Sequence, residues 1–312
     1  MNRPMAPWRI LIADGLAEEG QAILRRQAEI VEASDLAALP RFDGLIVRSR
    51  TQVTGAGLFG AARRLKVVGR AGVGVDNIDL KAAAAAGVIV VNAPLAATVS
   101  VAEHALALML ALARQIPRGD AAMRRGEWLK KEIQGSELSG KTLGLIGFGR
   151  IGRALAERAA GLGMRVIASD PLVPAETVRE AGAEPVAFET LLATADYVSL
   201  HVPLTAETRG MIGSEALAHC KPGARLISTA RGGVVDEPAL LLALETGRLA
   251  GAALDVFAEE PPRLAALIQH PAVISTPHIA AQTVEAQTRA AVDIAEETLA
   301  ALRGEPLRWR VV

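Results

Sequence analysis

The sequence has a single cysteine, Cys220, so it can form neither an internal disulfide nor a metal cage built from cysteines. It also has no excess charge of either sign, because 34 Lys and Arg residues balance 34 Asp and Glu residues. A balanced chain has no overall field to hold nucleic acid or an anionic membrane, so any anion it binds must be held by local groups. We therefore expect no bound metal, no nucleic-acid partner and no membrane partner.

Long hydrophobic runs are missing as well. The longest wholly apolar stretch, Ala105–Ala113, is about half of what a membrane span requires. Near the N-terminus, the apolar stretch Trp8–Ala13 contains Arg9 and stops at Asp14, which is unlike a signal peptide. The single cysteine and these absences favour a soluble protein of the reducing cytoplasm. A chain of 312 residues that is 51% hydrophobic has enough core for two domains.

Short aliphatic runs alternate with helical patterns along the whole chain. Continuous apolar runs, in place of strict alternation, are typical of parallel strands covered on both faces. Two such series predict an α/β fold with two doubly wound parallel-sheet lobes of the Rossmann or flavodoxin-like kind. The expected strands are Ile10–Ala13, Leu45–Val47, Val67–Val68 and Val88–Val91 in the first series, and Thr142–Ile146, Arg165–Ser169, Tyr197–Leu200, Arg225–Ser228, Gly251–Leu254 and Val273–Ser275 in the second.

The join between the lobes is expected at Asn92-Ala93-Pro94, where a proline follows a strand. The longest helical pattern, Val99 to about Gln115, is apolar on most sides, so we expect it at a subunit or lobe interface. The final helix, Val284–Leu302, has no strand to lead to in the second lobe and is expected to fold back on the first. The predicted domains are residues 1–93 with 283–312, and residues 94–282.

A glycine-rich loop gives the clearest chemical signal. The motif Gly147-Phe148-Gly149-Arg150-Ile151-Gly152 directly follows one predicted strand and directly precedes a helical pattern. Its glycines allow a tight turn, a close approach of pyrophosphate and close packing of helix on strand, while the helix N-terminus faces the negative charge. Asp170 ends the next strand, 18 residues after Gly152, where a carboxylate binds ribose hydroxyls and repels a 2′-phosphate. The sequence therefore predicts an NAD site.

Three segments of the second lobe carry a family resemblance: Thr229–Glu237, Ala253–Pro261 and Thr276–Ala280. Through them the chain resembles the D-isomer-specific 2-hydroxyacid dehydrogenases along essentially its whole length. The segments Gly44–Ser49 and Val68–Asn77 make it most similar to the D-3-phosphoglycerate dehydrogenases of that family. The resemblance implies a NAD-binding domain, and a substrate (catalytic) domain built from both chain ends.

Hydride transfer from a 2-hydroxy acid needs a proton acceptor and a cation for the carboxylate. His278 suits the first task, because imidazole titrates near neutral pH, and Glu260 can bind the imidazole and fix its tautomer. Arg231 offers a planar fork of donors for the substrate. Each residue also has a purely structural interpretation: His278 shapes a turn, Arg231 pairs with Asp236, and Glu260 is a solvated loop charge.

The resemblance implies further site residues. It places His201 in a loop against the cofactor, and His104 is interpreted as packed or interfacial. The implied cofactor contacts are Val73, Gly147, Gly149, Arg150, Ile151, Gly152, Asp170, His201, Val202, Pro203, Thr208, Thr229, Ala230, Arg231, Asp255, His278 and Ala280. The expected substrate contacts, some of them argued from strand positions below, are Arg48, Ser49, Arg70, Gly72, Val73, Gly74, Arg231 and His278.

Arg48 and Arg70 follow consecutive predicted strands, so they should lie at one sheet edge, where with Ser49 they suit a phosphate. In the structural alternative they pair with Asp43 or Asp76 and only hold loops. One departure from the phosphoglycerate pattern is Ala97, which stands where that pattern has a substrate-binding asparagine. One lost hydrogen bond costs about 0.5–1.5 kcal/mol, which leaves binding possible but opens the substrate to other acids.

The expected activity is NAD-dependent oxidation of D-3-phosphoglycerate to 3-phosphooxypyruvate, a step of serine biosynthesis. The alternatives are a glyoxylate, hydroxypyruvate or other 2-oxo acid reductase using NAD(P)H, and an NAD-sensing binding protein like a corepressor. We expect a homodimer or homotetramer. Because the sequence ends at Val312, without the C-terminal regulatory domain of longer relatives, we also expect no feedback by serine.

Overall fold

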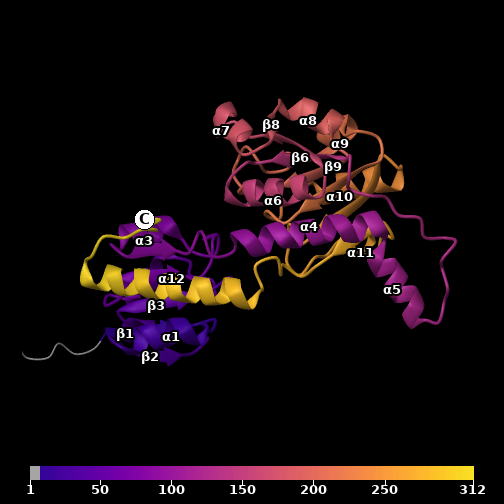
Figure 1. Ribbon diagram of the computed structural model, residues 1–312. Helices are drawn as coiled ribbons and strands as arrows, with labels where there is room; N and C mark the ends of the chain where they lie inside the picture. Colours follow the sequence, from indigo (N-terminus) through magenta and orange to yellow (C-terminus); the bar gives the residue numbers. More distant parts are fainter. Residues whose placement is uncertain (1–7) are drawn as a thin grey trace, which may run out of the picture. The chain divides into compact units, whose positions relative to one another are not determined.

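The structure, a computed structural model, describes residues 8–312. The described residues divide into two compact units, one of residues 8–98 with 281–312 and one of residues 99–280. Each unit contains one parallel sheet with helices on both faces (Figure 1). The predicted fold class, two doubly wound α/β lobes, is confirmed. Residues 1–7, which belong to the first predicted domain, lie outside the described residues.

The first unit has the strand order β2-β1-β3-β4-β5, and all neighbouring strands are parallel. The chain direction across the sheet reverses between β1 and β3, and such switch points are where doubly wound sheets bind ligands. The elements are β1 (Trp8–Ile12), α1 (Glu18–Arg25), β2 (Ala28–Glu32), the 3₁₀ helix η1 (Leu36–Arg41), β3 (Gly44–Val47), α2 (Ala56–Ala61), β4 (Val67–Arg70), α3 (Leu80–Ala85), β5 (Ile89–Asn92) and α12 (Val284–Arg303).

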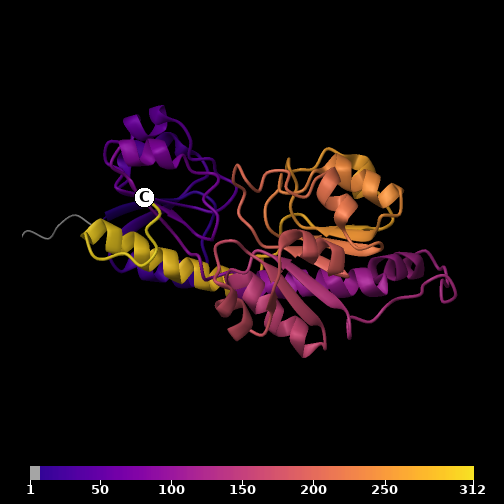
Figure 2. The same cartoon turned by 90° about the horizontal axis from the view of Figure 1, so that it is seen from above.

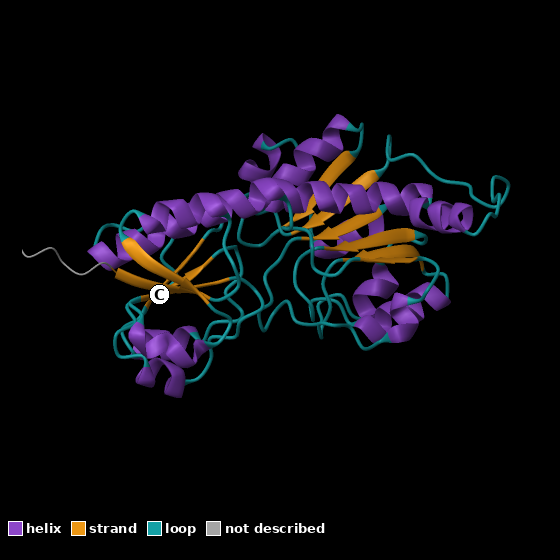
Figure 3. Ribbon diagram, turned by 90° about the horizontal axis from the view of Figure 1, so that it is seen from below, coloured by secondary structure: helices purple, strands orange, loops and turns teal. Residues whose placement is uncertain are grey.

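Alternate residues of these strands enter two separate cores. Ile10 and Ile12 of β1 pack in a core with Ile294 of α12, whereas Leu11 packs in a core with Phe59 of α2. The sheet therefore lies between α12 on one face and the short helices on the other (Figure 3). Because both faces are buried, the strands read as continuous apolar runs.

The second unit has the strand order β12-β11-β10-β9-β6-β7-β8, again all parallel, with its switch point between β6 and β9. Helices cover both faces of this sheet (Figure 2). Its elements are α4 (Thr98–Arg114), α5 (Ile116–Arg124), β6 (Thr142–Ile146), α6 (Arg150–Gly161), β7 (Arg165–Ser169), α7 (Ala175–Glu180), β8 (Glu184–Pro185), α8 (Phe188–Thr194), β9 (Tyr197–Leu200), α9 (Ser214–His219), β10 (Ala224–Ser228), α10 (Glu237–Glu245), β11 (Leu249–Leu254), α11 (Ala265–Ile268) and β12 (Val273–Ser275).

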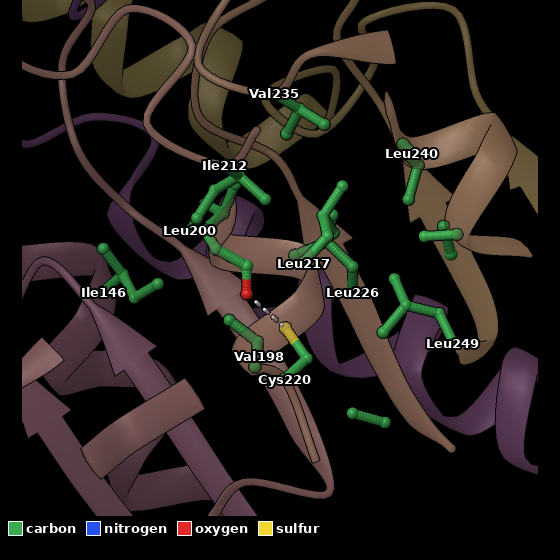
Figure 4. Close-up of a cluster of buried hydrophobic side chains, with 14 of the residues drawn as sticks. Ile146, Val198, Leu200, Ile212, Leu217, Cys220, Leu226, Val235, Leu240 and Leu249 are labelled. Carbon is green, nitrogen blue, oxygen red and sulfur yellow. Dashed lines mark hydrogen bonds between the residues drawn. The ribbon is translucent and has the colours of Figure 1, made fainter. Parts of the chain in front are cut away.

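The core on one face of the second sheet contains the single cysteine (Figure 4). Cys220 packs beside Leu217 and Leu226, and its thiol donates a weak hydrogen bond to the carbonyl oxygen of Ala216 at 3.4 Å. Burial raises the pKa of the Cys220 thiol to about 11. The thiol therefore remains protonated at neutral pH and has a packing role.

Helix α4 lies on the other face of this sheet. The second unit itself buries several of the apolar side chains of α4. Ala105, Met109 and Leu112 are buried in the core that α4 shares with α6. The adjoining sheet accommodates these small and aliphatic side chains, and the expectation that α4 lies at a subunit or lobe interface stays a prediction. Val99 and Leu110 remain 42% and 38% exposed.

Two short strands are absent from the sequence prediction. β2 contains two glutamates in five residues, and β8 has two residues, one of them Pro185. Both are edge strands, where half-exposed faces and proline are tolerated, so their sequences lack the apolar signal of central strands.

Within residues 8–312, no single helix is long and apolar enough to span a membrane. Helices α4 and α5 pass that test of length and composition only as a pair, and they are bent by 65° where they meet.

Candidate active site

The loop after β6 has the geometry of a phosphate-binding turn. Gly147 has a φ of +90°, and a Cβ there would lie 2.6 Å from the carbonyl oxygen of His201. A Cβ on Gly152 would lie 2.5 Å from the carbonyl oxygen of Gly147, so this glycine lets α6 begin against the strand. A Cβ on Gly149, in contrast, would meet no atom within 4 Å, which leaves the backbone open to a ligand. The residues present therefore fit a pyrophosphate at the N-terminus of α6.

Asp170 lies directly after β7 and is tied to this loop. One carboxylate oxygen accepts a hydrogen bond from the backbone N–H of Phe148 at 2.8 Å, and the other accepts one from Leu172 N–H at 2.9 Å. The carboxylate is thus held at the strand end beside the glycine loop. A negative charge fixed there suits the hydroxyls of an adenosine ribose and repels a 2′-phosphate.

The loop after β9 flanks the same switch point. His201 N–H donates to the carbonyl oxygen of Ile146 at 2.8 Å, and Thr208 Oγ1 donates to that of Pro203 at 2.6 Å. The His201 ring is hydrogen-bonded to Ser199 Oγ at 2.9 Å. Burial lowers the pKa of His201 to about 4, so the ring is neutral at pH 7. This environment supports a role in loop structure over a role as the catalytic base.

Three neighbouring strands of the second sheet end level with one another. Ser228 of β10 pairs with Leu254 of β11, which in turn pairs with Ser275 of β12. The carboxyl ends of these parallel strands therefore form one continuous edge. All three predicted catalytic residues follow it along the chain: Arg231 after β10, Glu260 after β11 and His278 after β12.

The turn that carries Arg231 is pressed against the loop that carries Glu260. A Cβ on Gly232 would lie only 1.7 Å from the carbonyl oxygen of Phe257, so glycine alone fits there. Phe257 N–H donates in turn to Glu260 Oε1 at 3.3 Å. The Arg231 guanidinium donates to the carbonyl oxygen of Ala230 at 2.7 Å. The two loops are therefore packed together as one piece of structure.

His278 and Glu260 form a hydrogen-bonded pair. His278 Nδ1 lies 2.9 Å and 3.1 Å from the two carboxylate oxygens, and both side chains are about two-fifths exposed. His278 has a φ of 54°, a left-handed conformation that costs energy in residues other than glycine. Glu260 is thus a partner of the imidazole and no solvated loop charge. Because a carboxylate only accepts, Nδ1 carries the proton in the neutral ring and Nε2 presents a lone pair.

Four further cofactor candidates lie beneath this edge and are buried. The Thr229 hydroxyl is buried and has no hydrogen-bond partner within the described part of the chain. Asp255 is completely buried, and its oxygens accept hydrogen bonds from Ile279 and Ala280 N–H, both at 2.9 Å. Asp255 therefore supports the loop from below. The four residues are Thr229, Ala230, Asp255 and Ala280.

The first unit has a basic pocket at its own switch point, between β1 and β3. The cavity is about 190 Å³ in volume. Arg48 Nη2 donates to Gln282 Oε1 at 2.9 Å, which joins the two ends of the unit's sequence. Two guanidinium groups and a hydroxyl in one small cavity suit a phosphate, and the Asp14 carboxylate, which lies 3.5 Å from Arg50 Nε, offsets one of the two positive charges. The lining residues are Asp14, Arg48, Ser49, Arg50 and Gln282.

Sequence reasoning missed Arg50, Asp14 and Gln282. The signal for Arg50 was its position, two residues after Arg48 in the same strand-end loop. Asp14 holds this loop: its carboxylate accepts hydrogen bonds from the Thr51 hydroxyl, at 2.6 Å, and from Arg48 N–H, at 2.7 Å. Although burial acts to raise the pKa of Asp14, these hydrogen bonds outweigh it and lower the pKa below the ordinary value.

Arg70 does lie at the same sheet edge as Arg48, because it pairs in register with Val47 at the end of β3. Its guanidinium, however, donates to the carbonyl oxygen of Ala71 at 3.0 Å and lies against Gly72, outside the basic pocket. Arg70 thus lies against Gly72, the first residue of the expected substrate loop Gly72-Val73-Gly74. The structural alternative for Arg48 fails at Asp43, whose carboxylate is bound by Arg64 at 2.9 Å. Ala97 is buried, with 5% exposed.

Residues 106–280, more than half of the chain, match the family described as D-isomer specific 2-hydroxyacid dehydrogenase, NAD binding domain. The chain belongs to this family. The match includes the glycine loop, Asp170, the β10–β12 edge and the His278–Glu260 pair. The predicted family and its NAD cofactor are confirmed.

The chain is also similar to individual dehydrogenases along most of its length. It is 48% identical to D-3-phosphoglycerate dehydrogenase 2, chloroplastic, of Arabidopsis thaliana over 95% of this chain and 49% of that protein. It is 46% identical to the D-3-phosphoglycerate dehydrogenase of Bacillus subtilis over 96% of this chain and 58% of that protein. The chain thus spans about half the length of the curated relatives it matches. A solved glyoxylate reductase from Paecilomyes thermophila has a TM-score of 0.88 and 32% identity, covering 98% of this chain and 99% of that one.

Proposed function

We propose that the protein oxidises D-3-phosphoglycerate to 3-phosphooxypyruvate with NAD, a reaction of serine biosynthesis. The basic pocket of the first unit carries this choice of substrate. Arg48, Ser49 and Arg50 line it together with Asp14, and guanidinium groups with a hydroxyl are suited to bind a phosphate. The names of the relatives from Arabidopsis thaliana and Bacillus subtilis support the same substrate. In this proposal the first unit binds the substrate phosphate, and the second unit binds NAD and carries the catalytic residues.

The chemistry is assigned to the edge formed by β10, β11 and β12. His278 Nε2 takes the proton of the substrate C2 hydroxyl, because Nδ1 is engaged with Glu260. The carboxylate of Glu260 then stabilises the positive ring and prevents its rotation. Arg231 binds the substrate carboxylate and the oxygen on C2 through its fork of donors. When bound, NAD would supply the hydride acceptor for C2.

The proposed cofactor site uses the residues whose geometry fits it. The backbone around Gly149 and the first turn of α6 hold the pyrophosphate, and Asp170 holds the adenosine ribose. The loop of His201, Val202, Pro203 and Thr208 covers the other side of the switch point. Thr229 offers its unpartnered hydroxyl beside Ala230. Val73, Gly72 and Gly74 supply backbone to the substrate carboxylate.

A matched pair of substrates tests this function. D-3-phosphoglycerate and D-glycerate differ only by the phosphate, so NAD reduction is measured with both, and with D-lactate, at alkaline pH. We expect kcat/KM for D-3-phosphoglycerate to exceed that for D-glycerate by at least about 100-fold, the value of two charge-assisted hydrogen bonds. Equal values for the two acids would contradict the proposed phosphate site.

Ala97 and the glyoxylate reductase structure favour a second candidate. With alanine at position 97, the segment between β5 and α4 offers one side-chain hydrogen bond fewer to the substrate, which suits smaller acids. The candidate is a reductase of glyoxylate, hydroxypyruvate or another 2-oxo acid, and NADH oxidation with these acids measures it. An NAD-sensing binding protein would need no proton acceptor, and the intact His278–Glu260 pair argues against it.

We further propose that the protein acts in the cytoplasm as a homodimer, or as a homotetramer. Along α4 and α5 and the loop after them, five apolar side chains are exposed by 38% to 74%, and a partner copy would bury them. Light scattering after size exclusion measures the assembly. The exposed residues are Val99, Leu110, Ile116, Met123 and Trp128.

A further inference from the structure

His104 is a polar residue in an apolar helix, and the proposed mechanism gives it no task. It lies in the middle of α4, and its side chain is 20% exposed. Nε2 lies 3.1 Å from Thr276 Oγ1 and 3.5 Å from Asp255 Oδ1. The contact joins α4 to the loop after β12, 172 residues further along the chain.

The donor in this contact follows from counting protons. The Thr276 hydroxyl has one hydrogen, and it lies 2.6 Å from Asp255 Oδ1, a carboxylate oxygen that can only accept. The hydroxyl proton therefore points to Asp255, and Thr276 Oγ1 accepts from His104. His104 Nε2 accordingly carries a hydrogen, which fixes the tautomer of the neutral ring. The three side chains form one directed chain of hydrogen bonds.

Asp255 is the point at which this chain meets the proposed catalytic loop. Its side chain is fully buried, and the carboxylate also accepts hydrogen bonds from the backbone N–H groups of Ile279 and Ala280. The backbone carbonyl oxygen of Asp255 accepts a hydrogen bond from the N–H of His278 at 2.9 Å. Although burial acts to raise the pKa of Asp255, the nearby His104 ring and the hydrogen bonds from Thr276 and the backbone outweigh it and lower the pKa. The buried carboxylate of Asp255 thus holds the loop on both sides of His278, the residue with a φ of 54°.

We propose that His104 is a positioning residue: by donating through Thr276 to Asp255, it holds residues 276–280 in the strained conformation that aims His278. The effect of His104 on turnover rests on the proposed function, in which His278 is the base, but its effect on the loop does not. A histidine that only filled space in α4 would be replaceable by an apolar residue of similar size.

Two substitutions separate positioning from packing. His104→Leu keeps an apolar volume but has no donor, whereas the amide of His104→Gln places a donor near the position of Nε2. His219→Leu is the matched control, because His219 is exposed at the end of α9 and its ring bonds only the carbonyl oxygen of Glu215 among the described residues.

The first readout is amide hydrogen exchange of the peptide that contains Ile279 and Ala280, followed by mass spectrometry. We expect His104→Leu to speed this exchange at least tenfold and His104→Gln to restore it to within about threefold, with peptides of β6 and β7 unchanged. Unchanged exchange in His104→Leu, or equal acceleration in the Leu and Gln variants, would overturn the proposal. This readout needs no substrate, so it decides the proposal even if D-3-phosphoglycerate is not turned over.

The second readout is steady-state kinetics with the substrate that the wild type prefers. His104→Leu should lower kcat at least tenfold with KM changed less than threefold, and His104→Gln should recover most of kcat. Thr276→Val removes the hydroxyl that links His104 to Asp255. The variant with both His104→Leu and Thr276→Val should therefore be no slower than the slower of the two single variants. Multiplicative losses in the double variant would contradict a shared path. If His104→Leu fails to fold, Thr276→Val carries both readouts.

Discussion

His278 Nδ1 lies 2.9 Å from Glu260 Oε2, and the two residues belong to loops that follow neighbouring strands. The pair leaves Nε2 as the only ring atom that can take a proton from substrate. Glu260→Gln keeps an oxygen that accepts from Nδ1 but removes the charge that stabilises the protonated ring. We expect kcat to fall by roughly 100-fold with little change in KM, as befits a general-base step.

The neighbouring residue offers the control for this prediction. Glu259→Gln makes the same chemical change in the same loop, at a carboxylate that is about half exposed and pairs with Arg263. Its kcat should stay within about twofold of wild type, because exposed pairs of this kind contribute little. Equal losses in both variants would remove Glu260 from the mechanism.

Arg50 should discriminate between acids that carry a phosphate and acids that do not. Arg50→Gln removes one guanidinium from the basic pocket, and we expect kcat/KM for D-3-phosphoglycerate to fall by about 10- to 100-fold, the value of one charge-assisted hydrogen bond. The value for D-glycerate should not change. Arg63→Gln, at an exposed arginine of the same unit, should change neither. An equal loss of kcat/KM for both acids would show that Arg50 stabilises the loop and does not bind the phosphate.

Asp170 should set the preference for NAD over NADP. Asp170→Asn retains one oxygen for the N–H of Phe148 or Leu172 but no longer repels a 2′-phosphate. We expect the ratio of kcat/KM for NAD to that for NADP to fall at least about tenfold, mainly through a gain with NADP. The measurement is initial rates with both cofactors at saturating substrate. An unchanged ratio of kcat/KM between NAD and NADP would show that Asp170 does not set the cofactor preference.

Much of the second unit could be predicted from the sequence because its signals are local. The glycine motif lies between a strand and a helix, and each predicted catalytic residue lies within six residues of a strand end, so parallel topology alone aligns them. Contacts between distant segments could not be predicted in this way. The bond of Arg48 to Gln282 and that of His104 to Thr276 depend on how helices pack on sheets, which no short motif encodes.

Edge strands and shared surfaces escaped prediction for a related reason. β2 and β8 bury few side chains, so hydrophobic pattern does not mark them. The apolar surface of α4 indicated an interface, but the pattern does not tell whether the covering surface comes from the same unit or from another.

Asp14 links the basic pocket to stability at low pH. Because its pKa is lowered in the folded protein, its ionised form stabilises the fold above the ordinary value of 3.8, and this contribution is lost as the pH falls through the lowered pKa. Asp14→Asn should destabilise the protein by about 1–3 kcal/mol at pH 7. Thermal unfolding of both proteins between pH 7 and pH 3 should show the difference in Tm narrowing below pH 4. A difference independent of pH would contradict the ionised state.

The central claim is that the imidazole of His278 takes the substrate proton, and one variant tests it most directly. For His278→Ala we measure NAD reduction with D-3-phosphoglycerate together with NADH binding by fluorescence. The account predicts a loss of kcat of about 10²–10⁴-fold while the Kd for NADH stays within about threefold of wild type. Turnover at the wild-type rate by His278→Ala would contradict it.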